Sequence, residues 1–135
     1  MNGESKKREV QILLADDQPI IRYAVRKLLA VNPRFRVVGE AIDGEEAVVQ
    51  AEAIRPHVII LNISMPKKSG LEAAREIRAI VPEVAVIILS THADEQLIEE
   101  ARRCGAMAYV NKSEAGTKLI LAVEAASQGT EAFIN

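Results

Sequence analysis

Polar side chains that suit metal or phosphate binding follow four apolar segments of this 135-residue chain. They are Asp16 and Asp17, Asn62, Ser90 and Thr91, and Asn111 and Lys112. Carboxylate and amide oxygens suit a hard cation such as Mg²⁺, and a hydroxyl with an ammonium group suits a phosphoryl oxygen. For the two adjacent acids alone, a helix cap in a solvated turn would be the better interpretation. The coincidence of four such positions favours a binding site.

Five apolar segments are expected to form the strands that position these groups. They span residues 10–15, 35–41, 57–61, 84–90 and 107–111. Apolar residues recur at helical spacing after each segment, beginning with a stripe from Ile20 to Leu29, and the last helix is predicted over 117–128. The chain therefore alternates strand and helix five times.

Three of these strands are apolar on both faces, which predicts a parallel sheet with helices on both sides. Five β–α repeats of this length suit a doubly wound α/β fold, in which the crossovers are right-handed. Ligands of such folds bind outside the carboxyl ends of the strands. The four polar positions all lie at strand ends, so the sequence predicts one site along one edge of the sheet.

Length and composition favour one domain with a proper core, since 49% of the residues are hydrophobic. We expect a disordered arm over 1–9, the folded domain over 10–130, and a tail or the start of a linker over 131–135. The net charge of −2 argues against nucleic acid or an anionic membrane as a partner. No apolar run approaches the roughly 18–20 residues of a membrane span. The single cysteine, Cys104, excludes an internal disulfide and fits a cytoplasmic location.

The chain resembles the receiver domain of bacterial response regulators, in the CheY-like superfamily, over nearly its whole length. The matching segments are ILLADDQPIIR, AIDGEEAV, RPHVIILNISMP, SGLEAAREIR, VIILSTH and GAMAYVNKS. SGLEAAREIR and AMAYVNKS are most similar to the LuxR-type subfamily, whose members usually carry a helix-turn-helix DNA-binding domain after the receiver. The resemblance implies a flavodoxin-like (βα)5 sheet with strand order 2-1-3-4-5. It leaves open whether this is a stand-alone receiver or a fragment cut at the linker.

The resemblance also implies roles for the residues after the first and third strands. Asp17 is similar to the direct Mg²⁺ ligand of the family, and Asp16 to the acid that acts through metal-bound water. Ser64 stands where the family supplies a backbone carbonyl to the metal. Asn62 occupies the phosphoacceptor position, where the family has aspartate. An amide has no anionic oxygen with which to attack a phosphoryl group. We therefore expect no phosphorylation at Asn62, and Mg²⁺ binding that is weak or absent.

Three further residues match positions that, in the family, respond to phosphorylation. Ser90 matches the switch hydroxyl that contacts the phosphoryl group, and Lys112 the lysine that pairs with it. Tyr109 matches the aromatic residue that rotates inward on activation. The implied partner is a sensor histidine kinase or another signalling protein. We also expect a weak homodimer through the first and last helices, where Leu121 is predicted to face outward.

Two functions of different classes fit these residues. The first is a pseudo-receiver, a non-enzymatic module of two-component signalling that works through protein binding or dimerisation. The second is a conventional Mg²⁺-dependent phosphoaspartate receiver that carries an engineered Asp-to-Asn change at Asn62. A flavodoxin-like cofactor enzyme lacks support, because a Gly-rich phosphate loop is missing after the first strand, where Asp16-Asp17-Gln18-Pro19 stands. We favour the signalling module.

Overall fold

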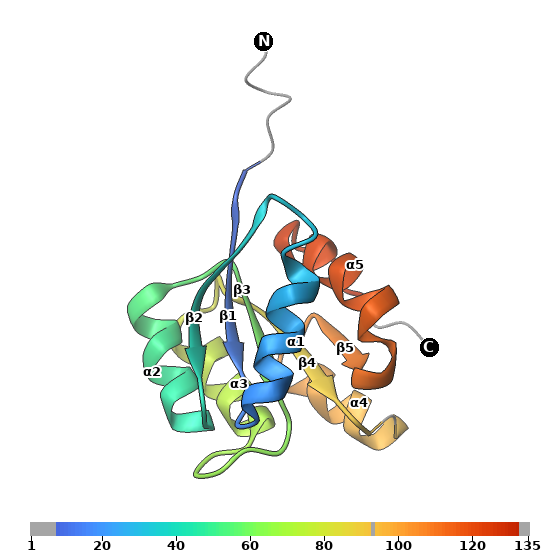
Figure 1. Cartoon of the computed structure of the whole chain (residues 1–135). Coiled ribbons are helices and arrows are strands. Elements are labelled where there is room, and N and C mark those ends of the chain that lie inside the picture. The colour runs from blue at the N-terminus through green and yellow to red at the C-terminus, as the bar shows by residue number, and fades with distance from the viewer. Residues whose placement is uncertain (1–7, 93, 133–135) are drawn as a thin grey trace.

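The computed structural model describes residues 8–92 and 94–132, and its centre is a five-stranded parallel sheet with strand order β2-β1-β3-β4-β5 (Figure 1). The strands are β1 (Val10–Ala15), β2 (Phe35–Ala41), β3 (Val58–Asn62), β4 (Ala85–Ser90) and β5 (Ala108–Asn111). The helices are α1 (Pro19–Leu29), α2 (Gly44–Ile54), α3 (Gly70–Ile80), α4 (Glu95–Arg103) and α5 (Ala115–Ser127), with a 3₁₀ turn, η2 (Lys112–Glu114), before α5. The predicted fold class and strand order are confirmed.

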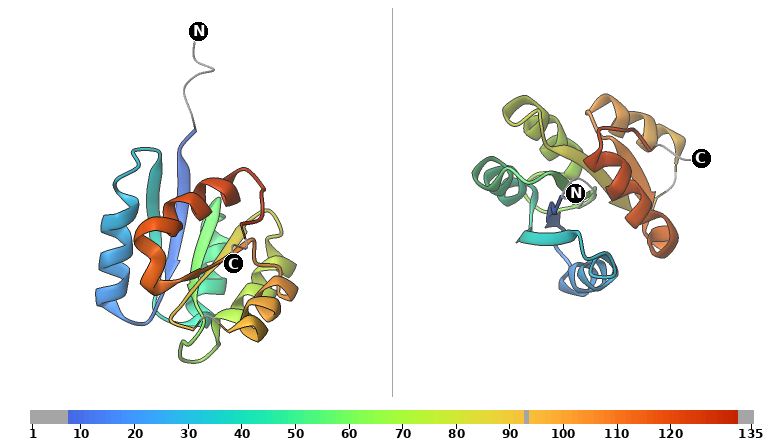
Figure 2. Two further views of the ribbon diagram at one scale, coloured as in Figure 1. Left: turned by 90° about the vertical axis from the view of Figure 1, so that its right-hand side faces the viewer. Right: turned by 90° about the horizontal axis from the view of Figure 1, so that it is seen from above.

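Helices cover both faces of the sheet: α1 and α5 lie on one side, and α2, α3 and α4 on the other (Figure 2). Successive residues of β3 alternate between the two cores. Ile59 and Leu61 belong to the core under α2, α3 and α4, whereas Val58 and Ile60 belong to the core under α1 and α5. Both faces of the central strand are therefore dry, which explains its uninterrupted apolar sequence.

Three helices begin at a residue whose side chain accepts a hydrogen bond from a backbone N–H of the first turn. Ser69 and Glu72 form a reciprocal capping box at the start of α3. The side chain of Asp43 accepts from the backbone N–H of Glu46 at the start of α2, and Asp94 caps α4 in the same way. At α1, Gln18 is the N-cap residue without a side-chain cap bond, and Pro19 is the first helical residue. The acid pair therefore does not cap α1, in line with the binding-site interpretation that the four strand ends favoured.

Several strand and helix boundaries differ from the sequence prediction by one or two residues, among them the end of the third strand and the start of the last helix. The third strand runs through Asn62, one residue further than expected, because Asn62 still pairs with Leu89 of β4. The last helix begins at Ala115 rather than at residue 117, and Gly116 lies inside its first turn. Ile20, expected in the apolar stripe of α1, is 70% exposed, whereas Val25 and Leu29 of the same helix are buried.

The two outer edges of the sheet differ. Beside β5, the segment that follows α5 returns to the sheet, where Ala132 bridges to Ala108 in parallel and its N–H donates to the carbonyl of Met107. The predicted arm over 1–9 and tail over 131–135 fall partly on residues 1–7 and 133–135, which lie outside the described residues. Arg8 accepts a bond from Arg34 through its carbonyl. None of the described helices is long and apolar enough to cross a membrane.

Candidate functional site

The carboxyl ends of β1, β3, β4 and β5 bring five of the predicted site residues to one end of the sheet, toward the bottom of Figure 1. They are Asp16, Asp17, Asn62, Ser90 and Lys112. Asp16, Asn62 and Ser90 are buried, with 5%, 9% and 1% of their surface exposed, whereas Asp17 lies on the open side of the pocket. The pocket is therefore closed on the sheet side and open to solvent at the strand ends.

The Asn62 amide bridges two oxygen acceptors. Its Nδ2 donates to the backbone carbonyl of Ser64 at 2.7 Å and lies 3.5 Å from Oδ1 of Asp17. The first bond is short and well formed, and the second is at the limit of a hydrogen bond. A cation in this position would contact the same two kinds of oxygen, a backbone carbonyl and a carboxylate. The partial positive charge of the amide hydrogens thus lies between the groups that a metal ion would bind.

Asp16 is held by three elements. Its Oδ1 accepts from the N–H of Gln18 at 2.9 Å, and its backbone carbonyl accepts from Nη1 of Arg22 at 2.7 Å. Its Oδ2 lies 3.1 Å from Nζ of Lys112, with side chains that are 7% and 14% exposed. Among the buried side-chain oxygens and nitrogens of the described residues, this Oδ2 is the one without an aligned hydrogen bond. Lys112 therefore compensates the charge of the Asp16 carboxylate.

Ser90, His92 and Tyr109 form a chain of contacts beside the pocket. The N–H of His92 donates to Oγ of Ser90 at 3.0 Å, and the hydroxyl of Tyr109 donates to the carbonyl of His92 at 2.8 Å. Tyr109 is 7% exposed and packs with the core under α2, α3 and α4. The ring of Tyr109 therefore points inward, and its position is tied to the loop that carries Ser90.

Two glycines permit the backbone approach that shapes the loop after β3. A Cβ on Gly70 would lie 2.0 Å from the carbonyl oxygen of Asn62, and one on Gly44 would lie 1.9 Å from that of Lys68. The N–H of Gly70 donates to the carbonyl of Ile63 at 2.7 Å. The starts of α2 and α3 thus clamp the loop that carries Ser64. Sequence analysis did not assign these glycines a role, although each stands at the beginning of a predicted helix.

Some predicted site residues do not join the cluster. Thr91 and the Ser64 side chain are exposed, so Ser64 contributes through its carbonyl alone. The side chain of Asn111 accepts from the N–H and the hydroxyl of Ser113 and thus caps η2. Gln18 and Arg22, which hold Asp16, were not among the site residues predicted from the sequence. Two signals could have indicated them. An aspartate often accepts a hydrogen bond from the backbone N–H two residues later, and an arginine in the first turn of the next helix can reach back to the end of the strand.

The oxygen donors of the pocket are of the kind that a divalent cation binds. In residues 8–92 and 94–132, no group of three or more His, Cys, Asp and Glu side chains is placed to hold a metal ion. Two carboxylates and the Ser64 carbonyl remain, and Oδ2 of Asp16 is buried without an aligned donor. This donor set is chemically suitable for Mg²⁺ but carries only two formal negative charges.

Comparison with known proteins agrees with this geometry. The model of the response regulator receiver domain family matches residues 12–124. The chain is 38% identical over 129 residues to the transcriptional regulatory protein DegU of Brevibacillus brevis, covering 96% of this chain and 55% of that protein. It is 37% identical over 118 residues to the transcriptional regulatory protein PdtaR of Mycobacterium tuberculosis, covering 86% of this chain and 56% of the relative. The chain thus spans a little more than half the length of these relatives.

Solved structures give the same assignment. A LuxR-family two-component response regulator from Aurantimonas superposes with a TM-score of 0.89 at 32% identity, covering 93% of this chain and 89% of that one. The receiver domain of the response regulator NarL from Mycobacterium tuberculosis superposes with a TM-score of 0.86 at 28% identity, covering 91% of this chain and 99% of that one. Receiver domains are typically non-enzymatic signalling modules that generally bind Mg²⁺ at an acidic phosphorylation site and interact with histidine kinases. The chain belongs to the response regulator receiver domain family.

Proposed function

We propose that this receiver acts as a pseudo-receiver, a protein-interaction module of two-component signalling that does not accept a phosphoryl group at Asn62. The observation that supports this function is the bond from Nδ2 of Asn62 to the carbonyl of Ser64, with Asp17 beside it. The amide stands at the proposed phosphoacceptor position and donates to the Ser64 carbonyl, with the Asp17 carboxylate at the limit of a second hydrogen bond.

The chemistry of an amide supports the same proposal. In-line phosphoryl transfer needs an anionic oxygen, and the amide nitrogen lone pair is delocalised into the carbonyl. Asp16, Asp17 and the Ser64 carbonyl are the groups that would hold Mg²⁺, and the ion would neutralise charge on a phosphoryl group. Because Asn62 supplies no negative charge and engages two of these groups, we expect weak Mg²⁺ binding or none.

In this proposal, the residues that would respond to phosphorylation in the family keep their positions. They are Ser90, Lys112 and Tyr109. Lys112 pairs with Asp16 instead of a phosphoryl oxygen. Tyr109 lies inward and its hydroxyl donates to the His92 carbonyl, which ties β5 to the loop before α4. A sensor histidine kinase or another cytoplasmic signalling protein is the proposed partner, with weak self-association through α1 and α5.

Intact-mass measurement after incubation with a small phosphodonor and Mg²⁺ tests the proposal. We expect no mass gain for the wild-type chain and a gain of one phosphoryl group for Asn62→Asp. Ser64→Ala is the control, because the Ser64 hydroxyl is the nearest alternative acceptor in sequence. A stoichiometric gain on the wild-type chain would contradict the proposal, and its loss in Ser64→Ala would identify Ser64 as the acceptor.

The lengths and names of the relatives favour a second function. The chain spans 55% and 56% of two proteins named transcriptional regulatory proteins. A conventional Mg²⁺-dependent receiver with an engineered Asn62, normally controlling a LuxR-type DNA-binding domain, fits this observation. The codon at position 62 of the source gene separates the two functions, since an aspartate codon would show that Asn62 was introduced.

A further inference from the structure

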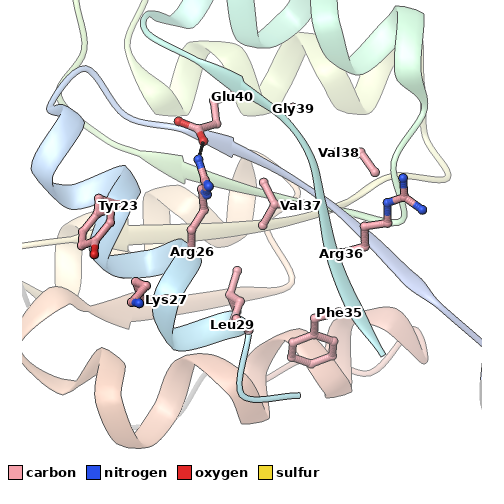
Figure 3. Close-up of a pocket in the computed structure, with 11 residues that line it drawn as sticks. Tyr23, Arg26, Lys27, Leu29, Phe35, Arg36, Val37, Val38, Gly39 and Glu40 are labelled. Atoms are coloured by element: carbon pink, nitrogen blue, oxygen red, sulfur yellow. Dashed lines mark hydrogen bonds and ion pairs between the residues drawn. The ribbon is translucent and has the colours of Figure 1, made fainter. Parts of the chain in front are cut away.

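A groove of about 740 Å³ lies between α1 and the edge strand β2 (Figure 3). Its floor is apolar and includes the buried side chains of Leu29 and Phe35 and the half-buried Val37. Tyr23 stands at its rim and is 59% exposed. In Figure 3, Val37 points from β2 toward α1, whereas Arg36 extends from the opposite side of the strand. The groove therefore offers an apolar surface directly beside the edge of the sheet.

Basic side chains border this edge on both faces of β2. Arg22 and Arg26 hold Glu40 through two bonds of 2.7 Å, which neutralise that carboxylate. Lys27 is exposed, with its Nζ 5.8 Å from the centroid of the Tyr23 ring. Three basic side chains, Arg26, Lys27 and Arg36, and one acidic side chain, Glu40, thus line the groove, which is a positive region of a protein whose net charge is −2.

Arg36 supplies the positive charge on the other side of β2. Its guanidinium lies 3.3 Å from the carboxylate of Glu9, and the two side chains are 69% and 47% exposed. An ion pair this exposed is worth little and exchanges easily with a competing carboxylate. Arg36 therefore remains able to bind an acidic ligand.

The outer side of β2 has unused backbone hydrogen-bonding capacity. At the ends of the strand, the N–H of Phe35 donates to Asn32, and the carbonyl of Glu40 accepts from Gln50. Between them, β2 pairs on one side only, with β1, and alternate backbone groups of an edge strand point outward. The other edge of the sheet, at β5, is covered by the chain itself through Ala132. Within the described residues, β2 is thus the open edge.

We propose that the edge of β2 and the groove beside it bind an extended acidic segment of a partner protein, which adds to the sheet as a further strand. Main-chain bonds to residues 36–39 would supply affinity, and the basic side chains would select carboxylates on either face of the added strand. The register of β2 against β1 skips Val38, which marks a bulge within this segment.

Charge and chemistry exclude two other occupants. A second copy of the chain, paired through its own β2, would bring Arg36 and Lys27 close to the same residues of the first copy, and like charges across strands are destabilising. A nucleic acid would meet the basic side chains but has no backbone amides to pair with a strand edge. The proposal goes beyond the function argued from Asn62, because none of the residues that line the groove belongs to that pocket.

Fluorescence anisotropy with a labelled peptide of sequence Glu-Glu-Val-Val-Glu-Glu-Val-Val tests the proposal, since each face of this strand carries both Glu and Val. We expect binding to the wild-type chain and to Asn62→Asp alike, and a loss of at least about tenfold in Lys27→Glu/Arg36→Glu. The matched control, Arg103→Glu/Lys118→Glu, changes the same charge away from the groove and should bind as the wild type does.

Three probes decide between occupants. The same peptide with Lys in place of Glu should not bind, and a peptide of unchanged charge with Pro at two Val positions should bind much more weakly, because Pro has no N–H to donate. Binding of the Pro peptide equal to that of the parent would overturn the strand-addition proposal. Tighter binding of an oligothymidylate, absence of binding by the acidic peptide, or NMR amide shifts at β5 instead of Arg36–Gly39 would each overturn it as well.

Discussion

Nζ of Lys112 lies 3.1 Å from Oδ2 of Asp16, and this pair joins the end of β5 to the end of β1 across the two strands between them. Both side chains are nearly buried. Removal of one partner of such a pair leaves an uncompensated charge in the pocket. We therefore expect the stability of the fold at the strand ends to depend on this ion pair.

Lys112→Ala should reduce the free energy of unfolding by about 3 kcal/mol because it leaves Asp16 buried and unpaired. Urea unfolding at neutral pH measures this. The control is Lys118→Ala, since Lys118 makes an exposed i,i+4 pair with Glu114 and its removal should cost less than about 0.5 kcal/mol. Equal losses in the two variants would contradict the structural role of Lys112.

Glu40 should make stability depend on acid pH. Burial raises the pKa of this carboxyl, but the hydrogen bonds and charges of Arg26 and Arg22 outweigh it, so the net pKa is lowered from 4.5. A lowered pKa means that the stabilisation is present above pH 4.5 and is lost as the pH falls through the folded-state pKa below it.

Glu40→Gln should therefore unfold more easily than the wild type at pH 7, by about 1 kcal/mol, because the carboxylate is partly exposed. The difference should shrink steadily as the pH is lowered below the pKa. Thermal melts over this range measure it, with Glu52→Gln, an exposed glutamate of α2, as the control. A difference that stays constant down to strongly acidic pH would contradict the assignment.

Gly70 and Gly116 should respond oppositely to alanine. A Cβ at Gly70 meets the backbone oxygen of Asn62 at 2.0 Å, so Gly70→Ala must displace α3 or the loop and should cost more than about 2 kcal/mol. Gly116 lies in α5 with nothing within 4 Å of an added Cβ. Gly116→Ala should stabilise by about 0.5–1 kcal/mol through helix propensity. Thermal melts of the two variants check this, and destabilisation of equal size would be evidence against the clamp.

Self-association should depend on Leu121. This side chain is 63% exposed on α5, and Ile20 and Tyr23 are exposed on α1, which covers the same face of the sheet. Leu121→Glu should sediment with a smaller dimer fraction than the wild type. Val49→Glu is the matched control, because Val49 is 65% exposed on α2, on the other side of the sheet. Equal profiles for wild type and Leu121→Glu, or an effect of Val49→Glu alone, would place the interface elsewhere.

The sequence predicted the features that follow from residue type and from the spacing of apolar residues: the strands, the helices and the edge of the sheet that carries the site. Apolar runs such as the one ending at Asn62 place strands, and parallel strands bring Asp16, Asn62, Ser90 and Lys112 to one edge whatever the details. The prediction that Leu121 faces outward followed from helical period alone and is confirmed.

What the sequence could not predict depends on loop geometry. The bond from Asn62 to the Ser64 carbonyl and the link from Tyr109 to the His92 carbonyl both end on backbone oxygens, whose direction is set by loop dihedral angles. Asn111 was expected in the cluster but caps its own 3₁₀ turn, since a short amide can bond locally as easily as it can face a pocket.

The Mg²⁺ dependence of the melting temperature tests the central claim most directly, that the Asn62 amide takes the place of a cation in the acidic pocket. In chelator, Asn62→Asp should melt below the wild type, because a third carboxylate adds repulsion on the order of 1 kcal/mol. Millimolar Mg²⁺ should restore the variant and leave the wild type nearly unchanged, since a ligand stabilises the native state according to its occupancy. Stabilisation of the wild type by Mg²⁺ as large as that of Asn62→Asp would contradict the account.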